Sequence, residues 1–127
     1  QEELLWDHRI LLVEDHDLNA KIVTRLLESK QIQVERAKNG KEAVELYAAS
    51  APYSYDAILM DINMPQKNGL ESTQIIREND KDTPIIIISA NAFEADKVNA
   101  YASGCNDFIV KPFKKETLLN TLKKHIK

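Results

Sequence analysis

The chain alternates short apolar runs with longer segments whose apolar residues recur at helical spacing. Apolar runs that are rich in β-branched residues and bounded by turn signals predict strands covered on both faces. The run at residues 32–37 alternates only imperfectly, which favours an edge strand. The predicted strands are residues 9–13, 32–37, 56–61, 85–88 and 108–110, and the predicted helices are residues 18–27, 40–47, 70–79, 93–103 and about 114 onward.

The order of these elements is a β-α unit repeated five times. Parallel strands need crossovers of about a dozen residues, and the predicted helices provide them. The pattern therefore predicts an α/β fold, a doubly wound parallel (βα)5 sheet with helices on both faces. Because crossovers are right-handed, few topologies remain, and we expect the flavodoxin-like strand order 2-1-3-4-5. We expect this domain at residues 9–127, preceded by a linker or upstream tail at residues 1–8.

Composition narrows the function classes only slightly. A chain of 127 residues makes one domain with a real core, and a net charge of -3 argues against direct nucleic-acid binding. No apolar run approaches the roughly 20 residues that span a bilayer, and no signal-peptide pattern opens the chain, so we expect no membrane insertion by this segment. The single cysteine, Cys105, cannot form an internal disulfide, which fits a reducing compartment such as the cytoplasm. We expect it to be a packing residue. Since the chain begins with Gln1, we expect a segment of a longer protein, whose parent can be membrane-anchored.

Polar side chains stand where four of the predicted strands end. In a parallel sheet the carboxyl ends of the strands meet at one edge, and open α/β sheets bind their ligands there. We therefore expect these side chains to converge, although they span most of the sequence. They are Glu14 and Asp15 after the first strand, Asp61 at the third, Ser89 at the fourth and Lys111 after the fifth.

This set of side chains points to phosphoryl transfer. Three neighbouring carboxylates repel one another by about a kcal/mol or more per pair, so the cluster needs a cation, and oxygen ligands without His or Cys favour Mg²⁺. Asp61 can attack phosphorus and form an aspartyl phosphate, while Lys111 and Ser89 can hold other phosphoryl oxygens. Each residue alone has an ordinary structural explanation; an acidic pair at a helix start, for example, is usually a cap. For that helix, Asp15, His16 and Asp17 are all available as cap.

The chain resembles the receiver (response-regulator) domain of two-component phosphorelay signalling over about residues 9–127. Several details further resemble the receiver domains of hybrid sensor histidine kinases. These are Asn19, the run 55–61 and the run 89–92. The residues that carry the general resemblance are Glu14-Asp15, Asp61 followed by Met64-Pro65 and Gly69, Ser89-Ala90, and Phe108 ahead of Lys111-Pro112-Phe113.

The resemblance implies a role for each matching residue. Asp61 would take a phosphoryl group from a phosphohistidine, and Mg²⁺, with Mn²⁺ as a substitute, would be bound by the acidic residues. The implied roles are metal ligation by Glu14, Asp15, Asp61 and the backbone carbonyl of Asn63; phosphoryl binding by Lys111; switching by Ser89 and Phe108; and modulation of phosphoryl loss by Asn63 and Asn91. Lys111-Pro112 is a candidate cis peptide.

The implied partner is the phosphohistidine domain of a histidine kinase or a histidine-phosphotransfer domain, with dimerisation left open. Such a domain catalyses its own Mg²⁺-dependent phosphorylation and dephosphorylation but is not a stand-alone enzyme; its parent chain would be a hybrid histidine kinase.

Three other functional hypotheses compete with that of a receiver domain. A haloacid-dehalogenase-type phosphatase needs a second aspartate two residues after the nucleophile, where this chain has Asn63. An FMN-binding flavodoxin-like protein would have its phosphate repelled by Glu14 and Asp15. A non-enzymatic interaction module that does not use its phosphorylation site stays open, because intact residues do not prove use.

Overall fold

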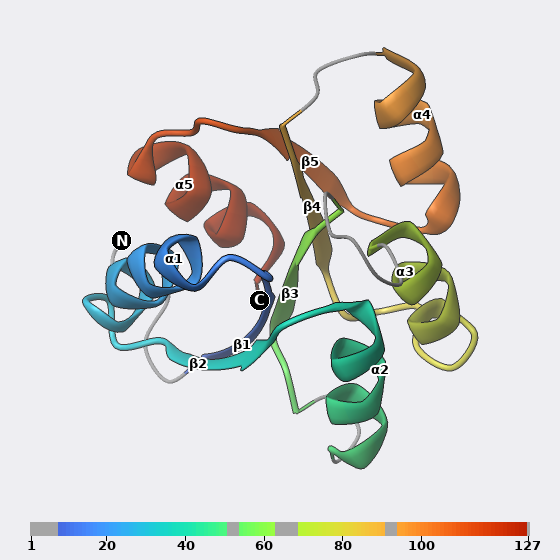
Figure 1. Cartoon of the computed structure of the whole chain (residues 1–127), viewed down its shortest axis with the longest axis horizontal. Coiled ribbons are helices and arrows are strands. Elements are labelled where there is room, and N and C mark those ends of the chain that lie inside the picture. Colours follow the sequence, from blue (N-terminus) through green and yellow to red (C-terminus); the bar gives the residue numbers. More distant parts are fainter. Residues whose placement is uncertain (1–7, 51–53, 63–68, 91–93, 127) are drawn as a thin grey trace.

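The computed structural model describes residues 8–50, 54–62, 69–90 and 94–126. Within them, β-strands and α-helices alternate as the sequence predicts, and all strand pairs are parallel in the order β2-β1-β3-β4-β5 (Figure 1). The α/β fold class and the strand order are thus confirmed. The elements are β1 (Arg9–Val13), α1 (Asp17–Glu28), β2 (Gln33–Ala37), α2 (Gly40–Ala49), β3 (Ala57–Asp61), α3 (Gly69–Arg77), β4 (Ile85–Ser89), α4 (Glu94–Ser103), β5 (Asp107–Val110) and α5 (Lys115–His125).

Strand β3 lies at the centre of the sheet, between β1 and β4. Every residue of β3 and β4 is buried, whereas β2 at the edge is mostly half-exposed. A strand that is covered on both faces reads as a continuous apolar run, and an edge strand does not. The burial pattern therefore explains why β3 and β4 gave the clearest sequence signals.

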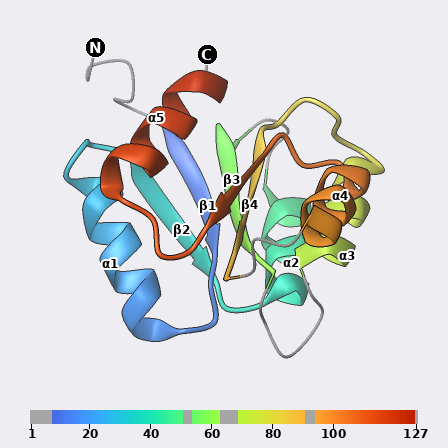
Figure 2. The ribbon, with the colours of Figure 1, turned by 90° about the horizontal axis from the view of Figure 1, so that it is seen from above.

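Two helices cover one face of the sheet and three cover the other (Figure 2). Alternate residues of each central strand point to opposite faces, as the pleat requires. Leu59 of β3, for example, packs on the α1 and α5 side, while Ile58 and Met60 pack on the side of α2, α3 and α4. Burial of this much apolar surface on both faces makes the sheet a rigid frame for residues at its edges.

The burial of two helices differs from what their apolar pattern predicts. In α1, the apolar residues Leu18 and Ile22 recur at the helical spacing that predicts a helix at residues 18–27, yet they are 59% and 57% exposed. In α3, Ser72 and Thr73 are buried, and the Thr73 hydroxyl donates to the carbonyl of Gly69 at 2.7 Å. A buried hydroxyl that is hydrogen-bonded within its own helix costs little, which accounts for the thin apolar face of α3.

The turn after α4 depends on glycine. Gly104 has φ of 112°, a conformation that other residues adopt only with strain. A Cβ there would lie 2.7 Å from Cγ of Arg77, whose Nε donates to the Gly104 carbonyl at 2.8 Å. The neighbouring Cys105 is buried, and this burial raises the pKa of its thiol to about 11, as expected of a packing residue. Among the described residues, no helix has the length and apolar character of a membrane span.

Candidate phosphoryl-transfer site

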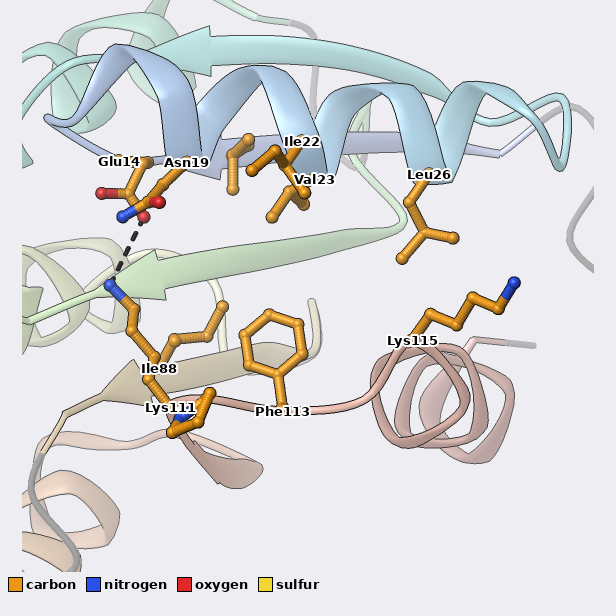
Figure 3. Close-up of a pocket in the computed structure, with 11 residues that line it drawn as sticks. Glu14, Asn19, Ile22, Val23, Leu26, Ile88, Lys111, Phe113 and Lys115 are labelled. Carbon is orange, nitrogen blue, oxygen red and sulfur yellow. Dashed lines mark ion pairs between the residues drawn. The ribbon is translucent and has the colours of Figure 1, made fainter.

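The strand-end side chains meet at the carboxyl edge of the sheet. One carboxylate oxygen from each of Glu14, Asp15 and Asp61 lies within 4.8 Å of the other two. The ammonium of Lys111 lies 2.8 Å from Oδ2 of Asp61 and 3.6 Å from Oε1 of Glu14. Glu14 and Lys111 reach each other across the sheet edge from β1 and β5 (Figure 3). The sheet therefore brings together residues from the first, third and fifth strands.

Asp61 is the last residue of β3 and is 2% exposed. The backbone N–H of Ile62 continues the ladder to the carbonyl of Ile88 at 3.1 Å, so the end of β3 is fixed against β4. The first residue of α3, Gly69, packs against the same end of β3. A Cβ on Gly69 would lie 2.7 Å from side-chain atoms of Ile62 and Met60 and 3.0 Å from the carbonyl of Asp61. Glycine is thus needed there for α3 to approach the strand that carries Asp61.

The acidic pair lies in the connection from β1 to α1. The N–H of Glu14 donates to the carbonyl of Ala37 at 3.0 Å, which extends the β1–β2 ladder past the end of β1. His16 is the N-cap of α1, and its Nδ1 accepts from the N–H of Asn19 at 3.4 Å. Of the three cap candidates, His16 is therefore the one used. Glu14 is 4% exposed, whereas Asp15 is exposed, so the cluster has a buried and an open side.

Burial and neighbouring charges shift the pKa values of Glu14 and Lys111 in this cluster. Burial, followed by the negative charge of Asp61, raises the pKa of Glu14 to about 7. Burial alone would lower the pKa of Lys111, but its hydrogen bond to Asp61 and the charges of Asp61 and Glu14 outweigh that effect and raise it. The cluster places three carboxyl groups beside a single ammonium, so its negative charge is not fully neutralised when all three are ionised. Further positive charge would stabilise it.

Ser89 and Phe108 lie on the neighbouring strands β4 and β5. Ser89 is fully buried at the end of β4, and its carbonyl accepts from the N–H of Lys111 at 2.8 Å. Phe108 is half-buried and packs against the core on the side of α2, α3 and α4. The peptide between Lys111 and Pro112 is cis, as the sequence suggested. Asn63 and Asn91, the remaining predicted site residues, lie outside the described residues.

A groove of about 360 Å³ opens beside the acidic cluster, between α1 and the segment that joins β5 to α5. Asn19 and Ile22 on α1 face Lys111 and Phe113 across it (Figure 3). The apolar spacing that predicts a helix at residues 18–27 does not show that Ile22 lines an exposed groove. The available signal was the width of the apolar stripe: α1 carries more large apolar residues than its buried face can hold.

The donor set fits a small divalent cation. Three carboxylates supply hard oxygen ligands, and the described residues place no histidine or cysteine among these clustered ligand atoms. Mg²⁺ is typically bound by one or two carboxylates together with water and phosphate oxygens. The open side of the cluster, at Asp15, leaves room for such ligands. The residues present are therefore suited to Mg²⁺.

Known proteins share both the sequence pattern and the fold. Residues 10–123 match the family described as the response regulator receiver domain. The chain is 41% identical to transcription factor prr1 of Schizosaccharomyces pombe over 96% of its own length, and 36% identical to hybrid signal transduction histidine kinase I of Dictyostelium discoideum over 93%. It covers only 22% and 7% of those two proteins, so it corresponds to one part of each.

Solved structures of related proteins share the fold of this chain. The receiver domain of a sensor histidine kinase from Pseudomonas aeruginosa superposes with a TM-score of 0.84 at 35% identity, covering 93% of this chain and 96% of that one. That structure has a magnesium ion coordinated in its active-site cleft. A chemotaxis protein from Vibrio cholerae superposes with a TM-score of 0.86 at 30% identity, covering 94% and 98% of the two chains.

Proposed function

We propose, from the premise that this chain belongs to the response regulator receiver family, that Asp61 accepts a phosphoryl group from a phosphohistidine in a Mg²⁺-dependent reaction. The observation that supports this most strongly is the pairing of a buried strand-end carboxylate with an ammonium. Nζ of Lys111 lies 2.8 Å from Asp61, with the carboxylates of Glu14 and Asp15 alongside. This arrangement presents one nucleophile among groups that can neutralise a phosphoryl group.

In the proposed reaction a carboxylate oxygen of Asp61 attacks the phosphorus. The new P–O bond forms as the P–N bond to the donor imidazole breaks, and the imidazole leaves. Lys111 stays near Asp61 and offers its ammonium to a phosphoryl oxygen, and the hydroxyl of Ser89 binds another oxygen after transfer. Most of the catalysis in such a transfer is positioning and charge stabilisation rather than acid–base chemistry.

We propose that Glu14, Asp15 and Asp61 hold the Mg²⁺, together with the backbone carbonyl of Asn63. When bound, the ion would neutralise the acidic cluster and the charge of the transferred group. Mn²⁺ as a substitute stays a prediction. The fit rests on the clustered carboxylate oxygens of Glu14, Asp15 and Asp61 and on the exposure of Asp15.

The donor would approach over α1. Leu18 and Ile22 are large apolar side chains that are more than half exposed, and Ile22 lines the groove that also contains Glu14 and Lys111. Exposed apolar residues grouped beside a reactive site are typical of a protein contact surface. We propose that this face receives the domain that carries the phosphohistidine, either in a histidine kinase or in a histidine-phosphotransfer domain.

Phosphorylation would act as a switch. Contacts of a phosphoryl group with Ser89 and Lys111 exist in only one arrangement of their loops, so phosphorylation would shift the population toward it. Phe108 would follow Ser89, since it lies on the adjacent strand, and Asn63 and Asn91 would set how fast the phosphoryl group is lost. Dimerisation would be one further readout of this switch.

We propose a hybrid histidine kinase as the parent chain, with residues 1–8 as the linker and residues 9–127 as the receiver domain in the cytoplasm. Three Dictyostelium discoideum hybrid kinases among the relatives support this. The similarity to prr1 keeps a transcription-factor parent as the alternative. We propose no direct contact of this domain with nucleic acid, because its net charge is -3.

Phosphorylation with a small phosphodonor tests the proposal. The protein incubated with acetyl phosphate should gain one phosphoryl group when Mg²⁺ is present and none with EDTA. Asp61→Asn should abolish the gain, while Asp56→Asn, at the other end of the same run, should not. Labelling that survives Asp61→Asn would refute the assignment, and a chain that binds its partner equally well with or without phosphorylation would favour a static interaction module.

A further inference from the structure

The connection from β1 to α1, residues 14–17, is tied to the edge strand by one side chain. Arg36 of β2 donates to the carbonyl of Glu14 twice, from Nε at 3.0 Å and from Nη2 at 2.8 Å. Its Nη1 donates to Oδ1 of Asp17 at 2.8 Å. Asp15 lies between these two anchored residues. One guanidinium therefore holds both ends of the segment that carries the exposed carboxylate of the acidic cluster.

The place of Arg36 in the sheet explains this contact. The β1–β2 ladder reaches the N–H of Glu14, which donates to the carbonyl of Ala37. Strand β2 ends at Ala37, and its pairing with β1 stops there. The guanidinium of Arg36 thus binds the Glu14 carbonyl just past the point where the backbone ladder stops. Strand β2 lies beside β1 at the edge of the sheet (Figure 2). This position brings the Arg36 side chain to the Glu14 carbonyl.

The geometry points to Arg36 as a positioning residue for the cation site: we propose that its two hydrogen bonds to the carbonyl of Glu14 hold Asp15 where its carboxylate faces those of Glu14 and Asp61. This rests on the proposed function, because it assumes that the acidic cluster binds Mg²⁺. Mg²⁺ demands near-ideal ligand geometry, so a loosened segment would bind it less well. Arg36 would act through the segment and would not contact the ion.

A purely electrostatic role predicts the opposite sign. Arg36 brings a positive charge close to the cluster, and the removal of that charge alone would tighten the binding of a cation. Its partner Asp17 is 85% exposed, and exposed ion pairs contribute little, so the two bonds to the Glu14 carbonyl carry most of the interaction. Weaker Mg²⁺ binding after the loss of Arg36 would therefore report geometry rather than charge.

Titration calorimetry with MgCl₂ on the purified chain tests the proposal directly. Arg36→Gln should raise the Mg²⁺ dissociation constant about tenfold, and Arg36→Lys, which keeps the charge but not the planar fork, several-fold. Asp17→Asn breaks only the exposed ion pair and should stay within about twofold of the unmodified chain. In phosphorylation with acetyl phosphate, Arg36→Gln should need more Mg²⁺ for half-maximal rate yet reach a near-normal rate at saturation.

The outcomes separate the two proposals. Unchanged or tighter Mg²⁺ binding in both Arg36 variants would overturn the role of Arg36 while leaving the proposed function intact. An unmodified chain that binds no Mg²⁺ would overturn the proposed function itself and this inference with it. Circular dichroism establishes whether each variant is folded, and if Arg36→Gln is not, Arg36→Lys decides the question by the same criterion.

Discussion

Replacement of Lys111 by methionine should destabilise the metal-free domain more at high pH than at low pH. The ammonium lies 2.8 Å from Asp61 and 3.6 Å from Glu14. At an effective dielectric constant of about 20, each contact is worth about 5 kcal/mol before the cost of desolvation. That cost offsets most of the gain for a side chain that is 25% exposed. We expect a net loss of about 2 kcal/mol in the free energy of unfolding at neutral pH.

The pH dependence follows from Glu14. Burial and the charge of Asp61 raise its pKa from 4.5 to about 7 in the folded chain. A carboxyl whose folded pKa is raised contributes stability that is fully present below its unfolded pKa and is lost as the pH rises through the folded value. In Lys111→Met the pKa of Glu14 should rise further, so the decline should continue above pH 7, by about 1 kcal/mol per pH unit.

Urea unfolding in EDTA at pH 5.5 and pH 8 measures this difference. Lys111→Met should lose about 1 kcal/mol more at pH 8 than at pH 5.5, because Glu14 is largely neutral at the lower pH. Lys111→Arg, which keeps the positive charge, should show a much smaller pH-dependent difference. An equal loss at both pH values, or a larger one at pH 5.5, would show that Glu14 and Lys111 are not electrostatically linked as described.

Two further predictions concern the buried carboxyl group of Asp80 and the exposed surface of α1. Asp80 is 5% exposed; burial opposes its charge, but hydrogen bonds from Thr83, Tyr47 and Asp82 lower its pKa to about 2. The stability that ionised Asp80 contributes is therefore present above pH 3.8 and lost as the pH falls through about 2. In urea unfolding, Asp80→Asn should lower the free energy of unfolding by about 2 kcal/mol at pH 7 and weaken its decline at acid pH, whereas Asp82→Asn, at an exposed residue, is the control. An Asp80→Asn chain as stable as the parent would contradict this. Ile22→Asp should slow phosphotransfer from a phosphohistidine protein at least tenfold but leave phosphorylation by acetyl phosphate unchanged. Val98 on α4 is equally exposed, at 57%, and Val98→Asp should change neither rate. Equal effects of the two variants would show that α1 is not the surface that binds the donor.

The sheet could be predicted because its strands are buried on both faces. Runs such as Ile85–Ser89 have no polar face to obscure them, and once the strands are parallel, their carboxyl ends must share an edge. Glu14, Asp61 and Lys111 could therefore be grouped from sequence alone. This worked across 50 residues between Asp61 and Lys111, where no local pattern links the two.

Other parts of the site depend on side-chain reach, which spacing does not encode. The stripe on α1 is too wide for its buried face, so the sequence could not say that Ile22 is exposed while Val23 is buried. Nothing around Arg36 distinguishes it from an ordinary edge-strand residue until its three hydrogen bonds are seen. The raised pKa of Glu14 likewise depends on depth of burial, which differs between Glu14 and its exposed neighbour Asp15.

The most direct test of the central claim is to locate the phosphoryl group. The chain is phosphorylated with acetyl phosphate and Mg²⁺, the acyl phosphate is reduced with borohydride, and the modified residue is mapped by peptide mass spectrometry. We predict a single modified residue, Asp61, that is absent when Mg²⁺ is omitted. Modification at any other residue, or none in a chain shown to bind Mg²⁺, would contradict the account.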